Sequence, residues 1–107
     1  MRVWDIPVSQ LCNKHLVAQH NEIHTIYSII TNNKKGFAHH PEVMRWRDKL
    51  GSLWVMHNVT ATEMERRGMK HNSPFADTVY GGQYPCSWQS VEVQKDLLRA
   101  KGCGCKV

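Results

Sequence analysis

The sequence predicts an all-α fold, a compact single domain over residues 1–107 with two long helices and one shorter C-terminal helix. Two observations carry this prediction. Apolar residues recur at every third or fourth position over two long stretches, which is the period of a helix that buries one face. Residues that suit helix termini flank these stretches, and no segment shows a convincing strand pattern.

The first helix is expected within residues 7–36, PVSQLCNKHLVAQHNEIHTIYSIITNNKKG. Ser9 is a suitable N-cap because its hydroxyl can accept a hydrogen bond from a free amide of the first turn. Asparagines, lysines and Gly36 at the other end are typical of a helix terminus. The helical period is kept by apolar residues at 12, 16, 23, 26, 27 and 30.

The second helix is expected within residues 39–68, HHPEVMRWRDKLGSLWVMHNVTATEMERRG. Pro41 suits the first turn, where no amide donor is needed, and Gly68 suits the end. One continuous apolar stripe favours a single helix of about 26 residues, in which Gly51 is a place for a bend. The stripe consists of Val43, Trp46, Leu50, Leu53, Trp54, His57, Ala61 and Met64.

A long loop is expected at residues 69–86, because this segment has prolines and adjacent glycines and no period. Loops of this length in small domains are often functional. Residues 87–102 predict the third, shorter helix. The tail at 103–107 is expected to be mobile.

Composition narrows the class of protein. Hydrophobic residues make up 41% of the 107 and charged residues 21%, which is typical of a globular chain. The net charge of +5 favours a polyanionic partner, nucleic acid before an acidic membrane surface or an acidic protein. No apolar run is long enough to span a membrane, and the N-terminus lacks a secretory core. We therefore expect a cytoplasmic protein, in the host cytoplasm if a phage encodes it, with no membrane partner.

A polar row lies on the first predicted helix. His15, Gln19 and Glu22 share one face, because they are spaced by four and three residues. Ile23 and Ile26 form the neighbouring apolar strip, so Glu22 is expected at the border of the core. Partial burial there can tune a carboxylate for acid or base chemistry. An ordinary solvated helix face would show the same spacing, so both interpretations stay open.

Metal-ligand patterns are weak. His20 and His24 have the spacing of a helical metal pair, but no HExxH motif occurs. The CGC segment at 103–105 could bind a soft metal together with Cys86, although the paired CxxC motifs of structural zinc sites are missing. We expect neither a metal ion nor a cofactor.

Basic clusters alternate with aromatic residues along the chain, which is a combination that favours nucleic acid through phosphate contacts and base stacking. Trp46 and Trp54 lie on the apolar stripe and are expected in the core. The basic clusters are Lys34–Lys35, Arg45–Arg47–Lys49 and Arg66–Arg67–Lys70.

The chain's own α-amine is a further candidate nucleophile. Its reference pKa is about 7.7–8.0, so a useful fraction is the free base at neutral pH. Because initiator methionine is trimmed mainly before small residues and Arg2 is large, the amine is expected to belong to Met1.

Three segments in order, MRVWDIPVSQLCNKHLVAQHNEIHTIYSIITNNKKG, HHPE and MERRGMKHNSP, resemble the pyrimidine-dimer DNA glycosylases of the phage endonuclease V type and their bacterial relatives. The resemblance covers roughly residues 1–75. It implies excision of a cyclobutane pyrimidine dimer, or of another damaged or modified base, followed by strand cleavage. In that family the N-terminal α-amine attacks the sugar C1′, a Schiff base forms, and β-elimination follows.

By position, the resemblance makes Met1 the nucleophile and Glu22 the catalytic carboxylate, with Arg2 and His15 beside the site. Phage members carry arginines where this chain has Asn21 and Thr25, so other basic residues are expected to supply phosphate contacts. The expected partner is damaged double-stranded DNA, bound by a monomer. The predicted DNA-binding residues are Arg2, Lys14, His15, Asn21, Lys34, Lys35, Arg45 and Arg47.

The main alternative is a non-catalytic module on the same fold that binds DNA, a nucleotide or a partner protein. Such a module would need neither Glu22 nor a free α-amine. A third interpretation is a small metal-binding protein that uses the histidines or the CGC segment.

Overall fold

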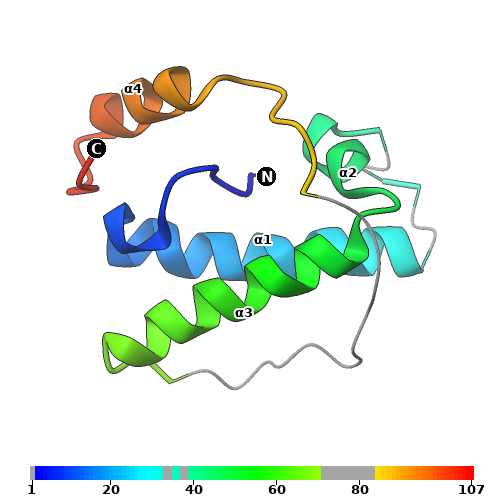
Figure 1. Ribbon diagram of the computed structural model, residues 1–107, viewed down its shortest axis with the longest axis horizontal. Helices are drawn as coiled ribbons and strands as arrows, with labels where there is room; N and C mark the ends of the chain where they lie inside the picture. Colours follow the sequence, from blue (N-terminus) through cyan, green and yellow to red (C-terminus); the bar gives the residue numbers. More distant parts are fainter. Residues whose placement is uncertain (1, 33–34, 37–38, 71–83) are drawn as a thin grey trace.

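The computed structural model describes residues 2–32, 35–36, 39–70 and 84–107. Every regular element in these ranges is helical, which confirms the all-α class. Three longer helices match the expected two long and one shorter, and two short elements accompany them. The elements are η1 (Val8–Gln10, a 3-10 turn), α1 (Asn13–Thr31), α2 (Pro41–Trp46), α3 (Leu50–Arg66) and α4 (Val91–Lys101) (Figure 1).

Helix α1 is shorter than expected at both ends. It begins at Asn13, with Cys12 as the N-cap, so the prediction of Ser9 as the cap was wrong. Residues before it form η1, after which Leu11 is extended at ψ 140° and only 2% exposed. Burial of Leu11 in the core interrupts the helical path, so α1 begins after it. At the other end α1 stops at Thr31, before Gly36.

The second predicted helix is two helices. Pro41 occupies the first turn of α2 as expected, but α2 ends at Trp46 and α3 begins at Leu50. The break lies at Arg47–Lys49 and not at Gly51. Asp48 there has a φ of +60°, a left-handed conformation that aspartate tolerates better than most residues. Because α2 and α3 both present apolar residues to α1, the stripe continues across the break and conceals it.

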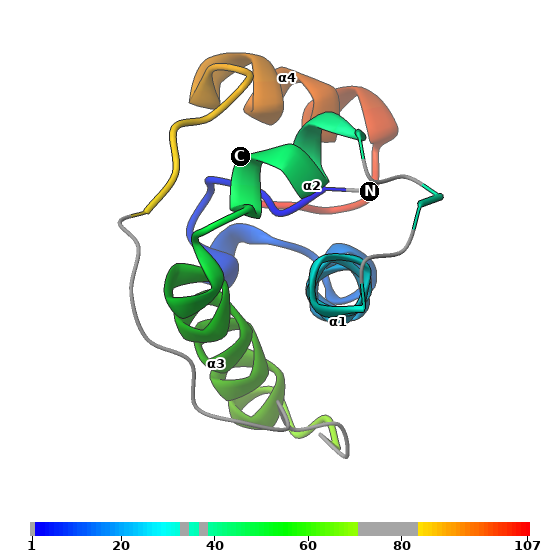
Figure 2. The same ribbon diagram turned by 90° about the vertical axis from the view of Figure 1, so that its right-hand side faces the viewer.

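Helix α3 runs back beside α1 in Figure 1, and Figure 2, which looks along α1, shows that the two helices cross. The N-terminal segment, residues 2–6, lies between α1 and α4 in both views. It contributes Val3, Trp4 and Ile6 to the core, all at most 7% exposed. This extended segment is therefore held between helices rather than lying on the surface.

The core has two clusters of buried apolar side chains. One joins Val3 to α1, α2 and α3, and includes Trp46 at 0% exposed, as the stripe predicted. The other joins Trp4 to α1 and α3 and includes Leu98 of α4. Among the described residues, no helix is long and apolar enough to cross a membrane.

Helix α4 has a regular cap at each end. The Ser90 side chain accepts a hydrogen bond from the Val93 amide, and Gly102 at φ +60° closes the helix. The tail that follows, expected to be mobile, is instead docked: the Lys106 amide donates to the Gln10 carbonyl at 2.7 Å. Most of the long loop predicted at 69–86 lies outside the described residues.

Candidate active site

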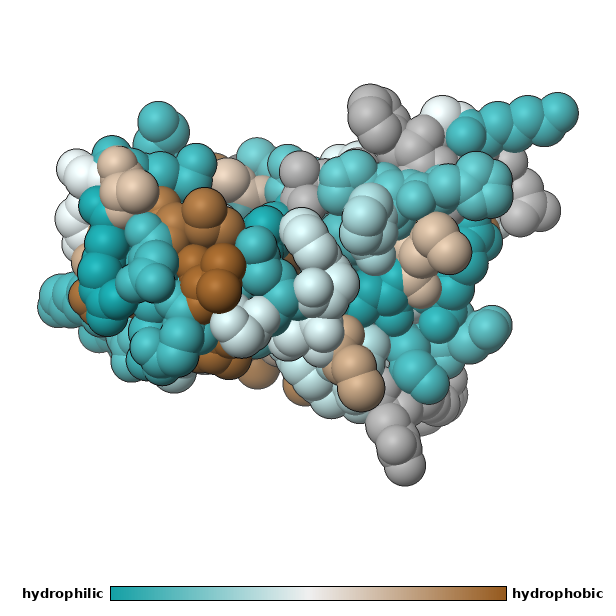
Figure 3. Space-filling model, turned by 90° about the horizontal axis from the view of Figure 1, so that it is seen from above, coloured by the Kyte–Doolittle hydropathy of each residue, from teal (hydrophilic) through white to brown (hydrophobic). Residues whose placement is uncertain are grey.

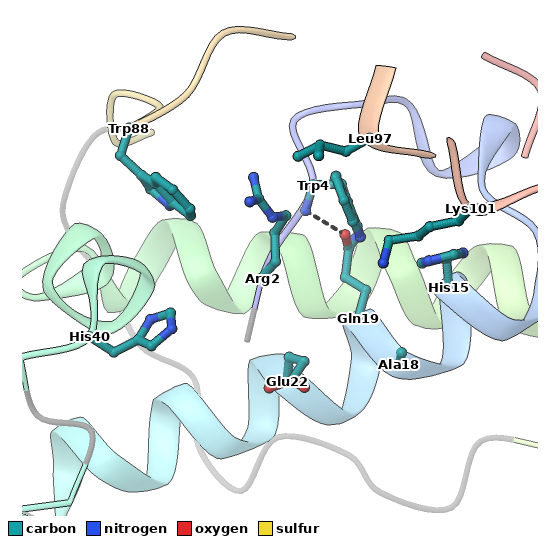
Figure 4. A pocket seen from close by; sticks show the side chains of 10 residues that line it. All are labelled: Arg2, Trp4, His15, Ala18, Gln19, Glu22, His40, Trp88, Leu97 and Lys101. Atoms are coloured by element: carbon teal, nitrogen blue, oxygen red, sulfur yellow. Dashed lines mark hydrogen bonds between the residues drawn. The ribbon is translucent and has the colours of Figure 1, made fainter. Parts of the chain in front are cut away.

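A cleft of about 560 Å³ lies where the N-terminal segment, α1 and α4 meet. Figure 4 shows the side chains that line it. They come from five parts of the chain: the N-terminal segment, α1, the residue before α2, the segment before α4, and α4 itself. The lining residues are Arg2, Trp4, His15, Ala18, Gln19, Glu22, His40, Trp88, Leu97 and Lys101.

The predicted polar row of α1 forms one wall of this cleft. His15, Gln19 and Glu22 all line it, as their shared helix face indicated. Of the residues carried over from the family resemblance, Arg2 joins them there. Four residues named from the sequence therefore meet in one cavity.

Gln19 is a structural link within this wall. Its side chain is 1% exposed, accepts a hydrogen bond from the Trp4 amide at 2.7 Å, and donates to the Thr60 hydroxyl at 3.1 Å. The bond to Trp4 is drawn in Figure 4. Gln19 thus ties the N-terminal segment to α1 and to α3, and fixes where the chain enters the cleft.

Glu22 follows Gln19 by one turn of α1 and is partly buried, as the adjacent apolar strip predicted. In Figure 4 Arg2 lies above Glu22 across the cleft. Lys101 of α4 brings a second cationic side chain to the same cavity. A carboxylate in this position can accept a proton or stabilise a positive charge on a bound ligand.

Arg2 is held in a fixed position between two indole rings. Its guanidinium carbon lies 4.7 Å from the Trp4 ring centroid and 4.4 Å from that of Trp88. Its Nη1 donates to Gln89 Oε1 at 2.6 Å. Burial lowers the pKa of Arg2 from its ordinary value, while the charges of Glu42 and Asp5 oppose that effect. The two rings therefore present a positioned cation to the cleft.

His15 occupies the far end of the cleft, away from Arg2. Its Nδ1 lies 3.1 Å from Cys12 Sγ, and its ring makes an edge contact with Trp4 at 6.0 Å between centroids. Burial and the nearby charges of Lys101 and Lys14 lower its pKa. The lowered pKa favours the neutral ring, which is a weaker partner for a phosphate than a charged one.

His40 lines the opposite end and explains part of the HHPE motif. Its Nδ1 accepts a hydrogen bond from the Glu42 amide at 3.1 Å, which caps α2. The motif's glutamate is fully buried: Glu42 accepts from Trp46 Nε1 at 2.9 Å and from Trp88 Nε1 at 2.6 Å. The motif therefore anchors Trp88, and through it Arg2.

Arg45 was predicted to bind DNA, and the structure places it in the interior instead. Its side chain is 3% exposed and forms ion pairs with Asp5 and Glu42. Its Nη1 also donates to the Val3 carbonyl at 3.1 Å. With its charge taken up by two carboxylates and little surface, this guanidinium has nothing to offer a phosphate.

Asp5 connects this interior cluster to the last third of the chain. Its carboxylate accepts hydrogen bonds from Tyr84 and Ser87, both at 2.5 Å, and from Gln94 at 2.9 Å. Burial favours a raised pKa for Asp5, but these bonds and Arg45 outweigh it and lower the pKa. Burial and the bond to Asp5 also raise the pKa of Tyr84 to about 12, so its phenol remains a donor.

The remaining predicted DNA contacts lie outside the cleft or outside the described residues. Lys14 and Asn21 are exposed on α1, each next to a cleft residue in sequence. Lys35 and Arg47 are also exposed. Met1 and Lys34 lie outside the described residues.

Sequence reasoning missed several cleft residues. Trp4 and His40 stand within segments quoted for the resemblance, but nothing in their spacing showed that they face Glu22. Lys101 gave no signal, because it is one of several basic residues near the end of α4.

Figure 3, which looks down on α4, shows apolar side chains gathered over that helix. Its exposed apolar residues are Val91, Val93 and Leu97, the last of which lines the cleft.

The histidine pair of α1 is part of a larger group. His20 and His24 pack against His57 of α3, with ring centroids 4.7–5.0 Å apart. His20 and His57 are at most 5% exposed. This group lies in the α1–α3 interface, and none of its members lines the cleft described above.

An all-helical basic chain with a carboxylate in a cleft among cationic side chains has the features of a small DNA-processing enzyme. The profile of the pyrimidine dimer DNA glycosylase family matches residues 1–77, and the chain belongs to that family. The resemblance to it was therefore correct. No curated protein and no solved structure gives a significant match. The family makes the protein a DNA-repair glycosylase with DNA as its substrate.

The family match divides the cleft into two parts. Seven of the ten lining residues lie within residues 1–77, including Arg2, Glu22 and His40. The other three, Trp88, Leu97 and Lys101, lie beyond it. The last third of this chain thus forms one side of the cavity, and the other side lies within the residues that the family match covers.

Proposed function

We propose that the protein excises cyclobutane pyrimidine dimers, or another damaged base, from double-stranded DNA as a monomer and then cleaves the strand as an AP lyase. The α-amine of Met1 is the nucleophile and Glu22 is the catalytic carboxylate. The observation that carries the proposal is that Arg2, the residue bonded to Met1, lines the same cleft as Glu22.

The reaction begins when the free-base amine attacks C1′ of the damaged nucleotide. The bond from C1′ to the base breaks, and the leaving base takes the electron pair. The amine then gives up one proton, and the C1′–O4′ bond breaks as O4′ takes up a proton, which leaves a protonated Schiff base. Removal of a proton from C2′ then expels the 3′ phosphate by β-elimination. The α-amine is suited to the first step, because its pKa of about 7.7–8.0 leaves free base available at neutral pH.

Glu22 has two tasks in this scheme. Its charge stabilises the cationic sugar and the protonated imine, and its oxygens accept or return protons during ring opening and elimination. Arg2, fixed between Trp4 and Trp88, is placed to hold a phosphate of the bound strand. Exposed Lys14 and Asn21 on α1 extend that contact along the backbone.

Borohydride trapping tests the nucleophile. Untagged protein is mixed with duplex DNA carrying one thymine dimer and, separately, with abasic duplex DNA. We expect a covalent adduct on both, located at Met1 by peptide mass, and no adduct when an N-terminal tag is retained. An adduct on abasic DNA alone would keep the lyase chemistry but move the substrate to another base. Absence of both adducts with tight binding would indicate a non-catalytic DNA-binding module.

The variant Glu22→Gln tests the carboxylate. Strand cleavage should fall by about 10²–10⁴-fold, the usual contribution of a positioned acid or base, while DNA affinity is kept. Glu92→Gln is the matched control, since Glu92 is 79% exposed on α4 and away from the cleft. Equal loss of binding and cleavage in Glu22→Gln would contradict a catalytic role.

A further inference from the structure

Four metal-binding side chains from the two ends of the chain meet beside the cleft. They are Cys12 and His15, at the start of α1, and Cys103 and Cys105, in the C-terminal tail. Their ligand atoms all lie within 4.8 Å of one another. Cys86 was the partner that the sequence suggested for the CGC segment, but it is exposed and does not belong to this group.

The distances fit a single tetrahedral ion. Cys103 Sγ and Cys105 Sγ are 3.4 Å apart, and His15 Nδ1 lies 3.1 Å from Cys12 Sγ and 3.6 Å from Cys105 Sγ. With Zn–S bonds of about 2.3 Å and Zn–N bonds of about 2.0–2.1 Å, the edges of a tetrahedron are about 3.8 Å between sulfurs and about 3.5 Å between sulfur and nitrogen. The three distances differ from these edges by a few tenths of an ångström at most, and the remaining pairs of ligand atoms lie within 4.8 Å of each other.

The backbone holds both ligand pairs in place. Cys12 and His15 are the N-cap and third residue of α1, so one turn of helix sets their spacing. In the tail, Gly102 and Gly104 have φ values of +60° and +94°, which allow the chain to turn twice and direct both sulfurs to the same side. The Cys12 amide donates to Cys105 Sγ at 3.1 Å, which holds this sulfur at the start of α1.

The tail is also fixed by contacts that do not involve these ligands. Its Lys106 amide donates to the Gln10 carbonyl at 2.7 Å. Arg99 Nε donates to the Val107 carbonyl at 3.0 Å. Val107 packs against the core cluster that contains Leu11 and Leu98. The four ligands are therefore brought together by the fold.

We propose that Cys12, His15, Cys103 and Cys105 bind one Zn²⁺ ion in a Cys₃His site that fastens the C-terminal tail to the start of α1. Three sulfurs and one imidazole are ligands for a soft or borderline cation, and four protein ligands leave no open position. The site is thus structural. The thiols release their protons on binding, and His15 coordinates through Nδ1.

The histidine group of the α1–α3 interface is a weaker candidate for the same ion. It offers three nitrogens and no thiolate, and two of its three members are almost completely buried. The cysteine group offers a complete set of four ligands, all partly exposed, so an ion can reach it.

The proposed ion would also position one wall of the cleft. His15 is shared between the ligand group and the cleft, and Lys101 lies on the last turn of α4, directly before the tail. Coordination through Nδ1 fixes the His15 ring and leaves Nε2 as a donor. His15 and the ion are then positioning elements and do not touch the reacting atoms.

Metal content tests the proposal independently of any activity on DNA. Wild-type protein purified without chelators under reducing conditions should contain one zinc per chain by elemental mass spectrometry. Cys103→Ser should retain below about a tenth of that zinc, and Cys86→Ser, the matched control outside the group, should retain all of it. A chelator should lower the Tm of the wild type and of Cys86→Ser but not that of Cys103→Ser.

Cobalt substitution gives a readout on the wild type that needs no variant. Co²⁺ should produce the thiolate charge-transfer absorption and the intense visible bands of a tetrahedral site, and Zn²⁺ should displace them. Absence of these bands together with absence of bound zinc would overturn the proposal. Zinc that persists in Cys103→Ser and is lost in His57→Asn would assign the ion to the histidine group. A Cys103–Cys105 disulfide under reducing conditions would also refute the site.

Discussion

The variant Asp5→Ala should destabilise the protein strongly, because Asp5 holds three parts of the chain together. Its carboxylate pairs with Arg45 of α2, accepts from Tyr84 and Ser87 of the segment before α4, and accepts from Gln94 of α4. Loss of these contacts weakens the attachment of the last third of the chain to the N-terminal segment.

The magnitude follows from burial and charge. The side chains of Asp5 and Arg45 are 9% and 3% exposed, and removal of one partner of a buried ion pair costs about 3–5 kcal/mol. Arg45 keeps Glu42 at 2.9 Å, and the exposed Tyr84 and Ser87 can turn to water. The lower end, about 3 kcal/mol, is therefore expected. For a chain of this size that corresponds to a decrease in Tm of about 12–24 °C.

Urea denaturation followed by circular dichroism measures this free energy directly. Asp96→Ala is the matched control, because Asp96 is 73% exposed in its ion pair with Arg99 on α4, and such a pair contributes about 0–1 kcal/mol. If Asp5→Ala and Asp96→Ala differ by less than about 1 kcal/mol, the proposed role of Asp5 is incorrect.

Three further predictions concern Gln19, Trp88 and Glu63. Gln19→Leu leaves the buried Trp4 amide without its acceptor and should cost about 1–3 kcal/mol in urea denaturation. Trp88→Ala should slow single-turnover cleavage of abasic DNA about threefold or more, since it removes one ring that holds Arg2, and Trp88→Phe, which keeps a ring but loses the bond to Glu42, should slow it less. Hydrogen bonds from Arg66 and Arg67 lower the pKa of Glu63 from 4.5 to about 2. The stabilising effect of its carboxylate is therefore complete above pH 4.5 and is lost as the pH falls toward 2. The free energies of unfolding of wild type and Glu63→Gln should converge over that pH range, and a constant difference between them would contradict the shift.

The helices themselves were accessible from sequence, because burial of one face imposes a period that survives any detail of packing. The break between α2 and α3 was not. Arg47–Lys49 contains neither glycine nor proline, and the left-handed residue is Asp48. What decides the break is the need of Trp46 and Leu53 to reach the same core cluster from two directions, which is a tertiary requirement.

The candidate site was predicted where it depends on one helix and missed where it depends on several. His15, Gln19 and Glu22 share a face through local geometry alone. Arg45 was assigned to the surface because its charge suits DNA, and its buried partner Asp5 stands forty positions earlier. A charge pattern cannot distinguish a guanidinium that faces solvent from one that faces an interior carboxylate.

The proposed zinc ligands were also missed, because the contacts that bring them together join distant parts of the sequence. Cys12 and His15 form one local pair and Cys103 and Cys105 form another. The contact between Cys105 and His15, however, joins residues that stand 90 positions apart in the sequence. Each pair alone is a weak indication of a metal site. Only the docking of the tail on η1 turns two weak pairs into one set of four ligands.

These connections indicate that the part of the chain beyond the family match belongs to the same folding unit. Asp5 and Glu42, within residues 1–77, bond to Ser87, Gln94 and Trp88 beyond it. Leu98 is 1% exposed in a core cluster with residues of the N-terminal segment and α1. Removal of residues 84–107 would expose that cluster and leave the Asp5–Arg45 pair open to water. We therefore expect residues 1–107 to unfold in one transition, and Arg2 to lose its position together with α4.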